Sequence, residues 1–222
     1  LTYSDKPNTG GLSRQVIFNE VEKSLKRLGT DYIDLFIIHR PDMNTPVEET
    51  MKALHDLVEM GKIRYIGASN MKAWQFAKYQ YTAKMQGWAQ FISLQNTHNI
   101  LSRNDEDELF PMLQDMGVSL TAFKVLVGGR LTREENETTV RSSTQELSDF
   151  EKEISKKLQA IAQRHNCSKA DVLIAWELAK KPIDVVLVGT TRMGRMTDTV
   201  KALEVSLSKE DINELESYLQ VD

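Results

Sequence analysis

A histidine and an arginine stand directly after the most apolar run of the chain, residues 32–38 (YIDLFII), and Pro41 follows them. A run of this length and polarity is typical of a parallel strand that is covered on both faces. Parallel α/β barrels carry their chemistry at the carboxyl ends of their strands. His39 is therefore a candidate active-site residue. The alternative is a strand-end histidine that bonds only to the backbone.

The segments around this strand alternate between strand-like and helix-like patterns. Strands are predicted at residues 32–38, 63–68, 91–94, 118–123 and 185–189, and helices at 13–29, 45–61, 73–86, 105–116, 149–165, 168–180, 196–203 and 208–219. Connections of helix length between strands indicate a parallel sheet with right-handed crossovers. No Gly-x-Gly-x-x-Gly turn follows a strand, which argues against a Rossmann domain. The pattern favours an α/β barrel over a doubly wound sheet.

Composition excludes several classes of protein. The 222 residues include 28 basic and 32 acidic side chains, which gives a formal net charge of −4. No block of like charge indicates nucleic acid or a membrane surface as a partner, and no apolar run could span a bilayer. Cys167 is the single cysteine, so no internal disulfide can form, which favours a cytoplasmic setting. The histidines and Cys167 show no metal-ligand spacing, so no metal is expected.

Six segments, in order along the chain, resemble the aldo-keto reductase superfamily, in particular its aryl-alcohol-dehydrogenase-like branch. They are residues 11–14 (GLSR), 27–35 (RLGTDYIDL), 38–40 (IHR), 61–70 (GKIRYIGASN), 128–132 (GGRLT) and 188–192 (VGTTR). The resemblance implies a parallel (β/α) barrel of the TIM type that binds NADPH in an extended pose. It also implies hydride transfer to an aldehyde or ketone.

The resemblance further implies a catalytic set of an aspartate, a tyrosine, a lysine and a histidine, of which only His39 has a counterpart here. The family's first three β/α units would precede Gly11. Because strand number and shear are linked in a closed barrel, we expect residues 1–222 to form one domain, an incomplete barrel of about five units. Its open edges and aliphatic inner face would be covered by a second copy or by a complementing chain.

Residues after the strands form the nicotinamide site that the resemblance implies. Ser69 and Asn70 match the pair that hydrogen-bonds the nicotinamide carboxamide, and Gln95 matches the family's glutamine at the next strand end. Phe123 occupies the position of the aromatic residue that stacks on the nicotinamide ring. The alternatives are turn chemistry for the Ser-Asn pair, a satisfied buried amide for Gln95 and core packing for Phe123.

A second group of residues would hold the phosphates of NADPH. Lys124 stands where the family usually has serine, near the pyrophosphate, and it either pairs with phosphate or marks a remodelled pocket. Gly128 and Arg130 lie in a segment that folds over the pyrophosphate in the family. Arginine suits the 2′-phosphate dianion. The residues implied for that phosphate and the adenine are Thr190, Thr191, Arg192, Arg195 and Asp198.

Asn96 and His98 are candidates for the substrate pocket, although packing explains His98 equally well. The long polar segment 132–148 is expected to be a mobile loop over the cofactor. Two functions from different classes fit these residues. One is NADPH-dependent reduction of a small-molecule carbonyl compound. The other is a repurposed relative without redox chemistry, either an isomerase or cyclase with His39 or His98 as proton carrier, or a non-catalytic binding protein.

Overall fold

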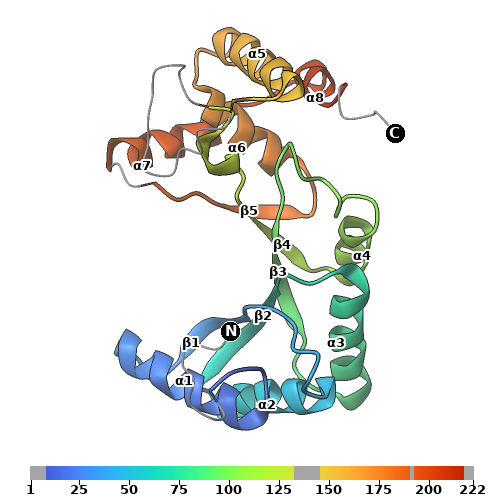
Figure 1. The fold of residues 1–222 in the computed structure, drawn as a ribbon. Coiled ribbons are helices and arrows are strands. Elements are labelled where there is room, and N and C mark those ends of the chain that lie inside the picture. Colours follow the sequence, from blue (N-terminus) through green and yellow to red (C-terminus); the bar gives the residue numbers. More distant parts are fainter. Residues whose placement is uncertain (1–8, 133–145, 191–192, 218–222) are drawn as a thin grey trace. The chain divides into compact units, whose positions relative to one another are not determined.

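The computed structural model describes residues 9–132, 146–190 and 193–217 (Figure 1). The chain divides into two compact units, residues 1–96 with 105–120, and residues 97–104 with 121–222. Most of the segment expected to be a mobile loop, residues 133–145, lies outside the described residues, so that expectation stays a prediction. The single-domain interpretation also stays a prediction. Within the described part of the chain, no helix is both long and apolar enough to cross a membrane.

Helices and strands alternate in the first unit, as the sequence predicts. Its elements are α1 (Arg14–Leu28), β1 (Ile33–Ile38), α2 (Val47–Glu59), β2 (Ile63–Ser69), α3 (Ala73–Gln86), β3 (Phe91–Thr97), α4 (Leu109–Met116) and the start of β4 (Ser119–Phe123). Helix α1 follows Ser13 and ends at Gly29, whose φ of 68° is the left-handed conformation that glycine adopts without strain. The predicted boundaries of this helix are therefore confirmed to within a residue.

The strands form a parallel sheet in which chain order and spatial order are the same, β1-β2-β3-β4-β5. Helices α1, α2 and α3 pack beside one another in the first unit (Figure 1). The side chains buried beneath them include Ile66 and Phe91, which are neighbours in the register of β2 and β3. This arrangement confirms the predicted parallel α/β architecture.

Part of the opposite face of β1 and β2 is apolar and exposed. Leu35 and Tyr65 are neighbours in the register, so they share one face, and Tyr65 is 58% exposed. Ile92 follows the buried Phe91 and is exposed too. Ile92 lies at the irregularity in the pairing of β2 with β3, where Phe91 pairs with Ile66 and Ser93 with Gly67. An exposed aliphatic face is what an incomplete barrel predicts.

The second unit is mainly helical. Its elements are the end of β4, a 3₁₀ turn η1 (Val127–Gly129), α5 (Asp149–Arg164), α6 (Lys169–Ala179), β5 (Ile183–Leu187), α7 (Met193–Val200), the 3₁₀ helix η2 (Lys201–Glu204) and α8 (Lys209–Glu216). Its core gathers apolar side chains of α5 and α6, among them Leu158, Ile161 and Trp176, together with Leu215 of α8. Serine N-caps with an acidic residue three positions later begin α5, α6 and α8.

Several predicted boundaries differ from the structure. The helix predicted at 196–203 begins earlier, as α7 at Met193, and the 3₁₀ helix η2 follows it from Lys201. Strand β3 continues to Thr97, three residues beyond the predicted end. Its last residues are polar, but a strand pairs through backbone hydrogen bonds, which do not require apolar side chains. Strand β5 covers Ile183–Leu187 and not 185–189, although the apolar run alone favours the later range. The helix predicted from residue 105 begins at Leu109.

Candidate functional site

Four predicted residues lie at the carboxyl ends of three neighbouring strands in the first unit. His39 follows β1, Ser69 ends β2, Asn70 comes next, and Gln95 lies near the end of β3. The register of the parallel strands pairs Ser69 with Gln95. Because parallel strands have their carboxyl ends at the same edge of the sheet, these residues come together there. We call them the Ser69–Gln95 cluster.

Hydrogen bonds hold this cluster together. The hydroxyl of Ser69 donates to the carbonyl oxygen of Gln95 (2.7 Å), and the backbone N–H of Asn70 donates to the same oxygen (3.0 Å). The side-chain nitrogen Nδ2 of Asn70 donates to the carbonyl oxygen of His39 (2.8 Å) and to Oγ of Ser69 (2.9 Å). Asn70 has a φ of 55°, a left-handed conformation that asparagine tolerates better than most residues.

The network leaves a specific set of polar groups for a ligand. Both neighbours of Asn70 Nδ2 are acceptors, which fixes the orientation of the amide. Among the described residues, none donates to the oxygen Oδ1 of Asn70, and the half-buried side-chain amide of Gln95 has no partner. These two amides match a planar ligand group that both donates and accepts, such as a carboxamide. The nicotinamide group that the fold implies therefore fits the residues present.

The imidazole of His39 is exposed, and its backbone carbonyl is the part that joins the cluster. The bond from Asn70 reaches the backbone of His39 and not its ring, so it decides between neither explanation of the imidazole. Its role as a hydrogen-bond donor to a carbonyl stays a prediction.

Asn96 plays a different part from its neighbour Gln95. Its side chain is buried, accepts from the backbone N–H of Met71 (3.2 Å) and donates to the carbonyl oxygen of Met71 (2.9 Å). It also donates to Oδ2 of Asp105 (3.0 Å). Asn96 is thus a buried amide whose hydrogen bonds are satisfied, which was the alternative explanation for the neighbouring Gln95. A substrate-pocket role for Asn96 stays a prediction, and its contacts favour a structural role.

Asp42 is a structural residue that sequence reasoning missed. Its carboxylate accepts from the backbone N–H of Leu12 (2.8 Å), the hydroxyl of Thr45 (2.7 Å) and the backbone N–H of Asn44 (2.9 Å). Burial raises the pKa of Asp42, but these hydrogen bonds lower it more, so its pKa lies below the ordinary value. An Asx turn, signalled by the Asp-Met-Asn-Thr sequence, was the available clue.

Phe123 and Lys124 lie in the second unit, at the end of β4. Phe123 is half-buried, and Lys124 is exposed with a φ of 61°. The ammonium of Lys124 lies over the ring of Phe123, 5.9 Å from its centroid. Two further residues of this turn, Val127 and Gly128, also have positive φ angles, of 50° and 64°. A β-branched residue in this conformation is strained, which is common at functional sites.

Arg130, predicted to lie over the pyrophosphate, is held by the first turn of α5. Its Nε and Nη2 bond to the two carboxylate oxygens of Glu151, the latter at 2.8 Å, and Nη2 also donates to the carbonyl oxygen of Glu146 (3.0 Å). The guanidinium of Arg130 holds the pKa of Glu151 at about 2. Glu151 was missed as its partner. The Ser148-x-x-Glu151 pattern indicates that Glu151 takes part in a capping box, but it does not indicate that Glu151 binds Arg130.

His98 is buried in the second unit. Its Nδ1 lies 2.7 Å from Oε2 of Glu177, which is buried as well. The imidazole stacks on the indole of Trp176, with ring centroids 5.7 Å apart and an angle of 12° between the planes. These contacts favour packing over a substrate pocket for His98, and the pocket role stays a prediction. Nothing in the local sequence indicated Glu177 as its partner.

The residues predicted to bind the 2′-phosphate and adenine are only partly described. Thr190 is half-buried after β5, and Arg195 belongs to α7. Asp198 is exposed and pairs with Lys201 at 2.9 Å. Thr191 and Arg192 lie outside the described residues. The predicted contacts with phosphate and adenine stay predictions.

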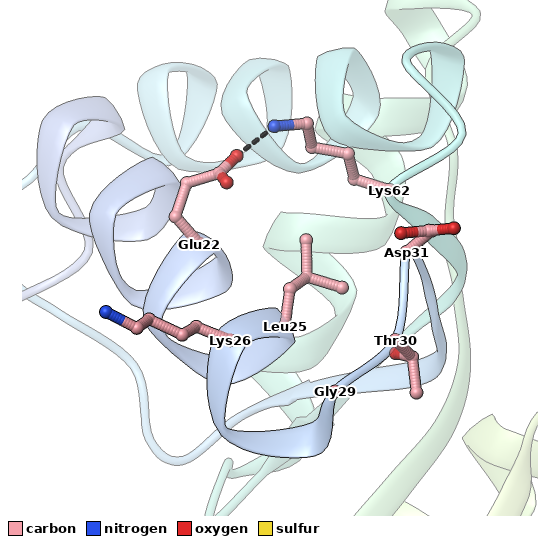
Figure 2. A pocket seen from close by; sticks show the side chains of 7 residues that line it. All are labelled: Glu22, Leu25, Lys26, Gly29, Thr30, Asp31 and Lys62. Carbon is pink, nitrogen blue, oxygen red and sulfur yellow. Dashed lines mark hydrogen bonds and ion pairs between the residues drawn. The ribbon is translucent and has the colours of Figure 1, made fainter.

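A separate hollow lies at the amino ends of β1 and β2, under α1. Figure 2 shows the carboxylate of Glu22 turned toward the ammonium of Lys62, with Leu25 between α1 and the strands. Gly29 and Asp31 line the hollow but belong to the turn before β1. In barrels this end of the strands serves stability and not chemistry. None of the predicted site residues lies there.

Comparison with known proteins gives one family. The chain matches the family described as the Aldo/keto reductase family over residues 2–220. A Schizosaccharomyces pombe protein, provisionally named aryl-alcohol dehydrogenase C977.14c, is 45% identical over 217 residues, which cover 94% of this chain and 61% of the relative. Versiconal hemiacetal acetate reductase of Aspergillus parasiticus is 40% identical over 222 residues, covering 96% of this chain and 64% of the relative.

A solved structure agrees with these relatives. The thermostable aldo-keto reductase Tm1743, determined with the inhibitor epalrestat, has a TM-score of 0.79 and 30% identity, covering 93% of this chain and 67% of that chain. The predicted α/β fold of the TIM-barrel type is therefore confirmed. The chain spans about six-tenths of the length of the two curated relatives.

Proposed function

Because this chain belongs to the aldo/keto reductase family, we propose that it binds NADPH and takes part in the reduction of an aldehyde or ketone. The observation that carries the proposal is the Ser69–Gln95 cluster. Its internal hydrogen bonds engage the nitrogen of the Asn70 amide and leave the oxygen for a ligand. The acceptor at Asn70 and the amide of Gln95 are complementary to a carboxamide, which nicotinamide carries.

The residues of the cluster would bind and orient, and they would not themselves exchange electrons. When bound, NADPH supplies a hydride to the carbonyl carbon of the substrate, while a proton reaches the carbonyl oxygen. Asn70 and Gln95 would hold the carboxamide and so fix which face of the ring is presented. The exposed imidazole of His39 would donate a hydrogen bond to the substrate oxygen, where negative charge develops during the reaction. Positioning of this kind supplies much of an enzyme's rate acceleration.

Preference for NADPH over NADH rests on the resemblance at residues 190–198. Arginines at positions 192 and 195 suit a phosphate dianion that NADH lacks. The substrate class, a small carbonyl compound, is consistent with relatives named as an alcohol dehydrogenase and a reductase.

Titration calorimetry with NADPH tests the proposal. We expect the chain to bind NADPH, and to bind NADH more weakly. Asn70→Gly removes the amide while glycine keeps the left-handed backbone without strain. It should weaken NADPH binding by about tenfold, the usual worth of a well-placed hydrogen bond in a site.

Asn166→Gly is the matched control. Asn166 also has a left-handed backbone, with a φ of 50°, but it lies in the turn between α5 and α6. Its replacement should leave the affinity for NADPH unchanged. A chain that binds no NADPH at millimolar cofactor, or that binds it equally well after Asn70→Gly, would overturn the proposal.

A further inference from the structure

The hydroxyl of Ser69 is used inside the protein. Ser69 is 1% exposed, although Asn70 directly after it is exposed. A serine hydroxyl carries a single hydrogen, and Ser69 donates it to the carbonyl oxygen of Gln95 (2.7 Å). The same atom, Oγ, accepts from Nδ2 of Asn70 (2.9 Å). Ser69 therefore has no hydrogen left to donate to a ligand, and burial keeps its remaining lone pair away from one.

These bonds run in one direction, from the Asn70 amide to the sheet. The direction is set by His39, whose carbonyl oxygen can only accept, and it accepts from Nδ2 of Asn70 (2.8 Å). If the amide were turned over, its oxygen would face the carbonyl oxygen of His39, an acceptor opposite an acceptor. Oγ of Ser69 could then bond to the amide only by withdrawing its hydrogen from Gln95. The network thus holds the amide with Oδ1 left for a ligand.

We infer that Ser69 is a positioning residue, which holds the Asn70 amide in its binding orientation and does not itself contact the ligand. The inference rests on the proposed function, in which the carboxamide of NADPH bonds to Asn70. It changes the role that the family resemblance implies for Ser69, since that role is a direct hydrogen bond to the carboxamide. All of the protein groups involved belong to the first unit.

Ser69→Ala should loosen the amide of Asn70 without disturbing the backbone that carries it. The carbonyl oxygen of Gln95 keeps its bond from the backbone N–H of Asn70 (3.0 Å), so it is not left unpaired. Nδ2 of Asn70 keeps only its bond to His39, and the amide can then turn. Because the ligand must order the amide again, affinity for NADPH should fall by about threefold, within the usual worth of one neutral hydrogen bond.

A double-mutant cycle tests whether Ser69 acts through Asn70. Titration calorimetry measures the dissociation constant of NADPH for the unchanged chain, Ser69→Ala, Asn70→Gly and the double variant. We expect Ser69→Ala to weaken binding by about threefold beside asparagine, and to have no effect beside glycine. Ser93→Ala is the matched control, because Ser93 is a buried serine of the neighbouring strand that pairs with Gly67. It should leave the affinity unchanged.

Nuclear magnetic resonance of the chain without ligand gives a second readout. The side-chain NH₂ signals of Asn70 are identified as the pair that Asn70→Gly removes. We expect Ser69→Ala to shift these signals and to speed their exchange with solvent. The backbone N–H of Asn70, which is bonded to Gln95, should stay protected. A structural role of Ser69 in the turn would instead change the backbone signal.

The outcomes separate the inference from the proposed function. Equal losses of affinity from Ser69→Ala in both backgrounds would mean that Ser69 contacts the ligand or acts by another route, and the inference would be wrong. No loss in either background, or an unchanged NH₂ signal of Asn70, would also overturn it. In these cases the proposed function stands. If the unchanged chain binds no NADPH, the proposed function fails and the inference falls with it.

Discussion

The two units of this protein hold their predicted site residues by different means. In the first unit, Ser69, Asn70 and Gln95 are joined through neutral groups and backbone carbonyl oxygens. In the second unit, Arg130 is bound to Glu151, and His98 lies against Glu177. One set of side chains is placed by the register of parallel strands, and the other by contacts with carboxylates that the helices carry.

This difference predicts different sensitivities. Neutral hydrogen bonds to the backbone respond little to salt or pH near neutrality. Ion pairs weaken with salt when exposed, and removing one partner of a buried pair leaves an uncompensated charge. Substitutions in the second unit should therefore show the larger and more condition-dependent effects.

The largest effect is expected at His98. His98→Phe keeps an aromatic ring on Trp176 but removes the imidazole nitrogen that lies 2.7 Å from the buried carboxylate of Glu177. The free energy of unfolding, measured by urea denaturation, should fall by about 3 kcal/mol.

His55→Phe is the matched change in the first unit. That imidazole also stacks on a tryptophan, Trp88, but its Nδ1 accepts only from the backbone N–H of Ala89. Its loss should cost about 1 kcal/mol or less, and equal losses at both sites would contradict the comparison.

A smaller loss is expected at Asn96. Asn96→Ala would leave the buried N–H and C=O of Met71 without their partner, so unfolding free energy should fall by about 2 kcal/mol. Gln95→Ala, one residue away, should change stability by less than about 0.5 kcal/mol, since its side chain bonds to none of the described residues. The same two variants should separate function: Gln95→Ala is expected to weaken NADPH binding. A stable Asn96→Ala variant with impaired substrate binding would instead favour the pocket role.

The pH dependence of stability should separate Asp211 from Asp42. Burial raises the pKa of Asp211, but hydrogen bonds from His165 and Ser208 and the charge of Arg164 lower it further, to about 2. A depressed folded-state pKa contributes stability above the unfolded value, near 3.8, and that contribution is lost as pH falls from about 4 to 2. Relative to the unchanged chain, Asp211→Asn should lose about 1–2 kcal/mol at neutral pH and show a flatter profile in that window.

Asp42 provides the comparison in the first unit. Its pKa is also lowered, but by neutral donors only. Asp42→Asn should therefore lose stability to an extent that does not depend on salt, whereas the loss in Asp211→Asn should diminish at high salt. The same salt response in both variants would remove the distinction drawn here.

The smallest effect concerns association. We expect the purified 222-residue chain to self-associate through the apolar surface that includes Leu35 and Tyr65. Tyr65→Lys places a charge on that face and should weaken association by about tenfold in sedimentation velocity experiments. Tyr81→Lys replaces a tyrosine that is also about half exposed, at 51%, but lies on α3, and it should have no effect. A strictly monomeric chain would contradict this expectation.

Much of the architecture could be predicted because its signals are local. Helix α1 lies between the caps Ser13 and Gly29, and α3 covers the predicted residues 73–86. Apolar runs predicted where the strands lie, but not the residues at which β3 and β5 end. Strand β3 continues through polar residues to Thr97, since backbone pairing, and not side-chain apolarity, defines a strand. The partners of Arg130 and His98, Glu151 and Glu177, stand 21 and 79 residues away, and no local pattern connects them.

The sequence by itself determined the alternation of strands and helices, the family, and the residue types that follow each strand. These depend on local spacing and on composition. Only the tertiary structure decided which of two adjacent side-chain amides is hydrogen-bonded within the protein. The amide of Asn96 is buried and bonds to Met71, whereas the half-buried amide of Gln95 is left for a ligand. Strand residues alternate between faces, but an irregularity between Ile66 and Gly67 shifts the pairing of β2 with β3. A shift of one residue exchanges the faces, so the outcome depends on packing between distant parts of the chain.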